Sequence, residues 1–132
     1  MAKKFVTKDS GKRQDYESGM RRDIQEGKPR YDLVVPLAME DHMLKRWASL
    51  LERGMAKYGY RNWELANSVE EMVRFQASAF RHFIQWTEGQ EDEDHAAAVF
   101  FNIQAYEYVK EKLALTPEEK QKMLKEIIQK QV

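Results

Sequence analysis

A cluster of acids next to a histidine is the stretch of this sequence best suited to chemistry. Residues 90–102 are Gln-Glu-Asp-Glu-Asp-His-Ala-Ala-Ala-Val-Phe-Phe-Asn. On a helix, at about 100° per residue, one narrow face would carry Glu91, Asp94, His95, Ala98 and Asn102. Carboxylates and an imidazole one turn apart are groups that a divalent cation needs. We therefore predict a metal site on this face.

A structural role for the same acids is the alternative interpretation. Acids at the start of a helix complement its dipole, and one of them can serve as the N-cap. His95 and Asn102 are harder to explain in this way, because both lie in an otherwise apolar helix of the kind that is usually buried.

Length and charge limit the class of protein. The chain has 132 residues, enough for one domain, with 22 basic and 22 acidic side chains. Such a balance argues against a dedicated nucleic-acid binder. The charge is uneven, however: residues 1–30 hold nine basic and five acidic side chains, whereas residues 31–115 hold nine and fourteen. This pattern suits a basic arm and an acidic metal pocket, although solvated surface charge explains it equally well.

The sequence lacks cysteine, a membrane-spanning run and a signal peptide, and these absences bear on the cellular compartment of the protein. The sequence has no cysteine, so disulfides and thiolate metal sites are excluded. No apolar run approaches the roughly 20 residues that span a membrane, and no signal-peptide core is present. We expect a soluble protein of the cytoplasm.

The elements that position the candidate residues begin with an arm. Residues 1–30 show no sustained pattern and are interpreted as an arm or loop, with residues 1–18 flexible. Lys28 and Arg30 in this segment can meet phosphates or simply be solvated. A short extended run follows at residues 31–35 and ends at Pro36.

Helical spacing starts at Pro36 and continues to Tyr58, where Gly59 supplies a stop. The loop at residues 58–64 then joins cationic, amide and aromatic groups in Arg61, Asn62 and Trp63. Loops carry function more often than cores do. The structural alternative is that Trp63 closes the end of a bundle while Arg61 pairs with a nearby glutamate.

A second helix is predicted from a capping box at Ser68 to about Trp86. Its polar stripe includes Arg81 and His82, and such a stripe is most often a solvent face. A short turn at residues 87–90 predicts an antiparallel hairpin with the next helix. His82 would then meet the acidic cluster, unless it is only a structural histidine.

The third helix contains residues 90–102 and continues to Leu113, and a fourth starts at Thr116 and Pro117. The predicted fold class is therefore all-α, a four-helix bundle with an extended N-terminal arm, in which residues 19–132 form the single helical domain. A carboxylate-metal centre between helices is a known feature of such bundles. These observations support metal-dependent hydrolysis of a small phosphorylated molecule.

Four motifs, in order, resemble a known family. They are Arg22-Asp23-x-x-Glu26-Gly27-Lys28-Pro29-Arg30-Tyr31-Asp32-Leu33, Gly54-x-x-Lys57-Tyr58-Gly59-x-Arg61-Asn62-Trp63-Glu64, Ser78-Ala79-x-Arg81-His82-x-x-x-Trp86-x-x-Gly89 and Asp92-Glu93-Asp94-His95-x-Ala97-Ala98-x-x-x-Asn102. Over about residues 19–110 this combination resembles the dATP/dGTP diphosphohydrolases of phages and bacteria. That family is similar to the MazG-like all-α nucleotide pyrophosphohydrolases.

The resemblance implies cleavage of a purine deoxynucleoside triphosphate to the monophosphate and pyrophosphate, with Mg²⁺ or Mn²⁺. In the MazG-like pattern, Glu-Glu-x-x-Glu and Glu-x-x-Asp hold the metal. Glu91-x-x-Asp94 matches the second half, whereas Glu70-Glu71-x-x-Arg74 departs from the first because it ends in a cation. A histidine, His82 or His95, is the expected substitute for the missing carboxylate.

We accordingly expect Glu91, Asp94 and His95 to bind the metal, and His82, Asp94 and His95 to be catalytic. The residues expected to bind the nucleotide are Lys28, Arg30, Lys57, Arg61, Asn62, Trp63, Arg81 and Asn102. The cations would neutralise the triphosphate, the asparagines would contact sugar or base, and Trp63 would stack on the purine.

Other functions compete with this one. The same architecture can hydrolyse another nucleotide or release single phosphates in steps. A noncatalytic protein that binds nucleic acid or a host protein is a different class, although polynucleotide binding is not expected at neutral net charge. A purely structural helical subunit conflicts with buried acids that have no counter-cation. We also expect a homo-oligomer, a dimer or tetramer, because four short helices leave aromatic surface to cover.

Overall fold

The computed structural model describes residues 4–131, which fall into two compact units, Met1–Val34 and Val35–Val132. Residues 1–3 and 132, which belong to the predicted arm and helical domain, lie outside the described residues. The assignment of domains from the sequence stays a prediction.

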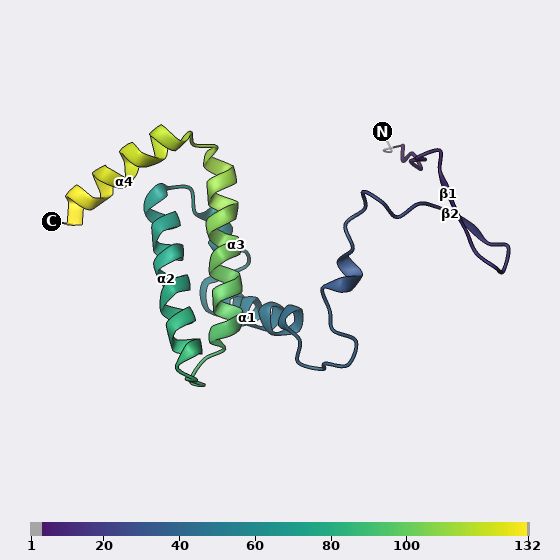
Figure 1. Cartoon of the computed structure of the whole chain (residues 1–132). Helices are drawn as coiled ribbons and strands as arrows, with labels where there is room; N and C mark the ends of the chain where they lie inside the picture. The colour runs from purple at the N-terminus through teal and green to yellow at the C-terminus, as the bar shows by residue number, and fades with distance from the viewer. Residues whose placement is uncertain (1–3, 132) are drawn as a thin grey trace. The chain divides into compact units, whose positions relative to one another are not determined.

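In the described residues of the second unit the regular secondary structure is all helical, which confirms the all-α class. This unit contains α1 (Met43–Tyr58), the short 3-10 helix η2 (Asn62–Leu65), α2 (Val69–Thr87), α3 (His95–Leu113) and α4 (Pro117–Gln131). Figure 1 shows α2 and α3 side by side as a hairpin, with α1 crossing near the turn that joins them. Within residues 4–131, no helix is long and apolar enough to cross a membrane.

The core lies where α2, α3 and α4 meet. Val69, Met72 and Val109 are each 1% exposed or less, and Ala66 from the loop before α2 joins them. Apolar side chains of α4 pack against this cluster, among them Met123, Leu124 and Ile127. Burial of apolar surface, at about 25 cal/mol per Å², therefore holds the hairpin and α4 together.

Local capping determines where three of these helices start. The Ser68 hydroxyl accepts from the Glu71 N–H at 3.2 Å, and the Glu71 carboxylate accepts from the Ser68 hydroxyl at 2.7 Å, so the predicted capping box is present. At α4 the Thr116 hydroxyl accepts from the Glu119 N–H at 3.1 Å, which confirms that start as well. At α1 the cap is His42, whose Nδ1 accepts from the Lys45 N–H at 3.2 Å.

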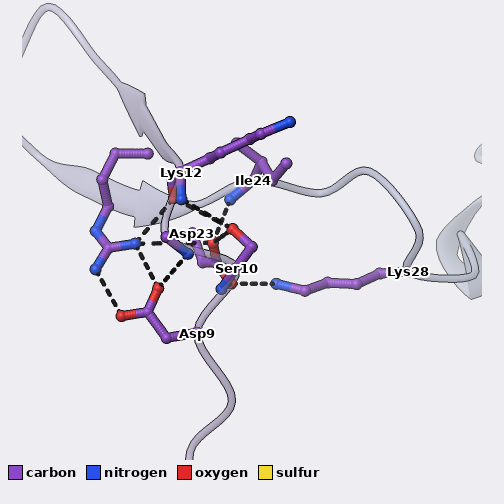
Figure 2. Close-up of polar contacts among 8 residues, drawn as sticks. Asp9, Ser10, Lys12, Asp23, Ile24 and Lys28 are labelled. Atoms are coloured by element: carbon purple, nitrogen blue, oxygen red, sulfur yellow. Dashed lines mark hydrogen bonds and ion pairs between the residues drawn. The ribbon is translucent and has the colours of Figure 1, made fainter.

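The first unit contains a small antiparallel hairpin, β1 (Arg13–Asp15) with β2 (Arg21–Asp23). Figure 2 shows the Asp23 carboxylate at the centre of a polar network. It accepts from the backbone N–H of Ser10 at 3.2 Å and of Ile24 at 3.0 Å, and it lies 3.7 Å from the Lys28 ammonium. The Ser10 hydroxyl also donates to the Asp23 carboxylate. This hydrogen bond is the main cause that lowers the pKa of Asp23, and the backbone bonds and Lys28 act in the same direction.

Three predicted elements need correction. The helix expected from Pro36 begins at Met43, after the His42 cap. The run at residues 31–35 is not extended, because local backbone bonds form the 3-10 helix η1 (Tyr31–Leu33). The segment interpreted as arm or loop contains the β1–β2 hairpin, whose three-residue strands are too short and too exposed to show an alternating pattern.

The third helix also starts later than predicted. Asp94 is its N-cap, since its side chain accepts from the Ala97 N–H, and α3 begins at His95. Glu91 therefore precedes the helix and does not share the predicted face. The rest of the stripe is confirmed, because His95, Ala98 and Asn102 are 2%, 5% and 6% exposed along α3.

Candidate functional site

A cleft of about 1100 Å³ opens among α1, the loop at residues 59–66, α2 and α3. The predicted site residues that line this cleft are Lys57, Arg61, Asn62, Trp63, His82, Asp94 and Asn102. The chain thus brings together residues from three of the four motifs. Arg81, Glu91 and His95 do not line the cleft, and Lys28 and Arg30 belong to the first unit.

Two buried histidines meet at the side of this cleft. The Nδ1 atoms of His82 on α2 and His95 at the start of α3 lie 2.9 Å apart. Glu93 adds a carboxylate, and ligand atoms of these three residues all lie within 4.8 Å of one another. The predicted contact between His82 and the acidic cluster is therefore present.

Neighbouring charges orient the two rings. His95 Nε2 lies 2.7 Å from the Asp92 carboxylate, so a proton on Nε2 is donated to Asp92 and Nδ1 keeps its lone pair. Arg81 Nη2 lies 3.3 Å from His82 Nε2, and a guanidinium only donates. His82 then donates its Nδ1 proton to His95, which completes a hydrogen-bonded chain from Arg81 to Asp92.

These residues fit a divalent metal ion. Two imidazole nitrogens and a carboxylate are a common donor set for borderline transition metals. The bond from His95 to Asp92 is the carboxylate–histidine arrangement that fixes the tautomer of a metal ligand. Binding through both Nδ1 atoms requires that the His82 proton moves to Nε2 and that Arg81, which only donates, gives up its contact with that nitrogen. Of the predicted ligands Glu91, Asp94 and His95, this group contains His95 alone.

Burial sets the charge state of His82. The ring is 7% exposed, and desolvation lowers its pKa, with the nearby Arg81 charge acting in the same direction. His82 is therefore neutral at pH 7, which is the state in which imidazole binds metals.

Asp94 is engaged elsewhere. Its two carboxylate oxygens accept from Arg46 Nη2 at 2.7 Å and Arg46 Nε at 2.9 Å. The hydrogen bonds from Arg46 lower the pKa of Asp94 below its ordinary value. The alternative interpretation of one acid as an N-cap is thus confirmed for Asp94.

Several cationic side chains line the cleft, and two of them make no ion pair or side-chain hydrogen bond with other described residues. Among the described residues, Arg53 and Arg74 take part in no ion pair or side-chain hydrogen bond, and both line the cleft. Lys57 Nζ lies 5.0 Å from the centre of the Tyr58 ring. Arg61, in contrast, pairs with Glu64 and donates to the Tyr60 hydroxyl at 3.1 Å. Positive charge is therefore available to an anion.

The loop carrying Arg61, Asn62 and Trp63 is held from α3. Lys112 Nζ donates to the backbone oxygens of Glu64 at 2.9 Å and Ala66 at 3.1 Å. The Trp63 ring packs edge-on against Phe101 and Tyr108, with centroid distances of 5.8 and 5.2 Å. The structural roles considered for this loop are therefore present: Trp63 packs on α3, and Arg61 pairs with Glu64. Asn62 stays exposed.

The remaining predicted residues are placed as follows. Asn102 is buried, and its Nδ2 donates to the Ala98 oxygen at 2.8 Å. Arg30 makes two hydrogen bonds to Asp32, at 2.8 and 2.6 Å, and Lys28 faces Asp23. Residues that the sequence did not single out are Arg46, Arg53, Arg74 and Glu93. Glu93 had a signal as part of the acid run, and Arg74 as the cation where the MazG-like pattern has a glutamate.

An all-α chain in which a histidine–carboxylate group that could hold a metal ion lies beside a cleft lined with cations is typical of a phosphohydrolase. The model of the dATP/dGTP diphosphohydrolase N-terminal family matches residues 18–115. The chain belongs to this family and is a nucleotide diphosphohydrolase. Comparisons with curated proteins and with solved structures find no match.

Proposed function

We propose that this enzyme cleaves purine deoxynucleoside triphosphates, dATP and dGTP, to the monophosphate and pyrophosphate with a bound Mn²⁺ or Mg²⁺. The observation that supports the proposal is one cleft lined by His82 and Glu93 of the possible metal group together with Arg53, Lys57 and Arg74. A triphosphate needs both kinds of group within reach of one another.

In the proposed reaction a water oxygen bonds to the α-phosphorus and the bond from that phosphorus to the bridging oxygen breaks. Pyrophosphate leaves, and the proton of the water passes to solvent. His82, Glu93 and His95 would hold the divalent ion, which would supply positive charge to the phosphates and lower the pKa of a water. Asp92 holds the His95 ring in the tautomer that this requires.

The free cations bind the polyphosphate. Arg53, Lys57 and Arg74 neutralise the charge that builds up on the leaving pyrophosphate. Asn62, exposed on the cleft wall, hydrogen-bonds to sugar or base. Arg61, which is paired with Glu64, and Trp63, which is packed on α3, shape the loop that carries Asn62.

The donor set favours Mn²⁺ over Mg²⁺. Magnesium prefers oxygen ligands and keeps its waters, whereas imidazole suits transition metals. Activity should accordingly be higher with Mn²⁺ at equal concentration.

We also propose that the enzyme is a cytoplasmic homo-oligomer acting on the free nucleotide pool. Its apolar face is exposed on α2 and α3, with Phe80 at 66%, Ile84 at 53%, Trp86 at 54% and Ile103 at 52%. A depression of about 410 Å³ lies between Phe80, Phe83 and Ile103 on the two helices. A second copy of the chain would cover this surface.

Product analysis tests the proposed reaction. The purified protein is incubated with each deoxynucleoside and ribonucleoside triphosphate, with Mn²⁺, Mg²⁺ or chelator. Chelator-sensitive formation of dAMP or dGMP with one equivalent of pyrophosphate is expected. Orthophosphate with a diphosphate intermediate would show stepwise release instead, and no turnover of any nucleotide would refute the proposal.

A further inference from the structure

We propose that Arg46 and Asp94 act as a positioning pair that fixes the start of α3 on α1 and so holds Glu93 and His95 ready for a metal ion. The inference rests on the proposed function, since it concerns the same metal group. Asp94 then acts through its neighbours and is not itself a ligand.

The contact between the two side chains is strong and specific. Two guanidinium nitrogens of Arg46, Nε and Nη2, donate to the two carboxylate oxygens of Asp94, and one of these oxygens also accepts from the Ala97 N–H. Bidentate, charge-assisted bonds of this kind fix both distance and angle. The side chains are only 34% and 20% exposed, so water screens them less than a surface pair.

The neighbours of Asp94 in the chain are the ones that need fixing. Glu93 is exposed, and among the described residues its carboxylate accepts no hydrogen bond, so its position depends on its backbone. That backbone is tied to α3 by the His95 N–H, which donates to the Glu93 oxygen at 3.0 Å, and the Ala98 N–H donates to the Asp94 oxygen at 3.0 Å. Holding Asp94 on α1 therefore holds Glu93 beside the histidines.

The competing hypothesis is the role expected from the sequence, Asp94 as a metal ligand. The two hypotheses predict opposite effects of removing Arg46. If Asp94 were a ligand, Arg46 would compete with the metal for the carboxylate, so its loss would leave Mn²⁺ affinity unchanged or raise it. If Asp94 is a positioning residue, the same loss lowers the affinity.

The test measures Mn²⁺ binding by calorimetry, without nucleotide, to the wild-type chain and to Arg46→Met, Arg46→Lys and Asp94→Asn. Lys45→Met is the matched control, because Lys45 is next to Arg46 on α1 and forms an exposed ion pair with Asp41, which precedes the helix. Circular dichroism below the melting temperature checks that each variant is folded. Arg46→Lys keeps the charge and serves as the readout if Arg46→Met does not fold.

Arg46→Met and Asp94→Asn should each weaken Mn²⁺ binding by about tenfold or more, the lower range for residues that orient metal ligands. Arg46→Lys should recover part of the loss, and Lys45→Met should match wild type. A variant that carries both Arg46→Met and Asp94→Asn should bind Mn²⁺ no more weakly than the weaker-binding of the two single variants. Unchanged or tighter binding by folded Arg46→Met or Arg46→Lys would overturn the inference, as would a wild-type chain that binds no Mn²⁺. A wild type that binds Mn²⁺ but turns over no nucleotide would refute the proposed function and leave the positioning pair standing.

Discussion

Replacing Glu93 by glutamine separates the metal group seen in the structure from the ligands expected from the sequence. The change keeps the size of the side chain and removes its charge. Glu93 is exposed, so the fold should be little affected, as for most surface substitutions. However, an oxygen of its carboxylate and a ring nitrogen from each of His82 and His95 all lie within 4.8 Å of one another.

The expected loss follows from Coulomb's law. Two unit charges 4 Å apart attract by about 1 kcal/mol in water, so a carboxylate and a divalent ion at that distance attract by about 2 kcal/mol. Using the water value allows for the exposure of Glu93. A loss of about 2 kcal/mol corresponds to roughly 30-fold weaker metal binding.

Mn²⁺ titration without nucleotide measures this loss, and hydrolysis of dGTP over a range of Mn²⁺ concentrations shows whether excess metal restores the rate. Glu91→Gln is the comparison, because Glu91 is equally exposed but lies outside the group. We expect Glu93→Gln to need about 30-fold more Mn²⁺ and Glu91→Gln to behave as wild type. Wild-type affinity in Glu93→Gln, or an equal loss in Glu91→Gln, would refute the assignment.

Three further results are expected. Because burial lowers the pKa of His82, the unfolded chain takes up a proton below about pH 6.5 that the folded chain does not. The free energy of unfolding in urea should therefore fall from pH 7 to pH 5 by up to about 1.4 kcal/mol per unit, and less steeply in His82→Gln; equal slopes would contradict the buried, neutral ring. Phe80→Glu should convert the oligomer to monomer in sedimentation, since a charge in a covered apolar surface is costly; a variant that sediments as wild type would exclude this face. Lys112→Met removes the bonds to the Glu64 and Ala66 oxygens and should raise KM for dGTP more than it lowers kcat; an unchanged KM would show that the loop does not need this anchor.

Features determined by neighbouring residues could be predicted from the sequence. The capping box at Ser68 and the Thr116–Pro117 start are such local signals, and both are present in the structure. The short turn at residues 87–90 was enough to predict the hairpin that brings His82 to His95. The ordered motifs were enough to identify the family.

The errors arise where a distant residue decides the local structure. The sequence prediction treated the acids at residues 91–94 as part of a helix that starts at residue 90. On such a helix Glu91 and Asp94 share one face. In the fold, Asp94 is held by Arg46, 48 positions earlier in the chain, and its cap starts the helix at His95. Glu93 in place of Glu91 then faces the histidines. Arg46 itself lies in an ordinary amphipathic pattern that gives no sign of this contact.

The hairpin of the first unit illustrates a second limit. Its strands have three residues each, and all but Asp23 are exposed, so no hydrophobic alternation marks them. Polar bonds to Asp23 tie its second strand to Ser10, and a search for hydrophobic patterns does not detect such bonds.

Pulsed electron paramagnetic resonance of the protein loaded with Mn²⁺ and a dGTP analogue with a methylene between the α- and β-phosphorus tests the central claim most directly. The spectrum reports ¹⁴N couplings from imidazole ligands and ³¹P couplings from phosphates in one sample. We expect nitrogen couplings from two imidazoles, of which His82→Gln loses one and keeps that of His95, and phosphorus couplings that depend on the analogue. Phosphorus couplings without any nitrogen coupling would contradict a metal held by His82 and His95 in this cleft.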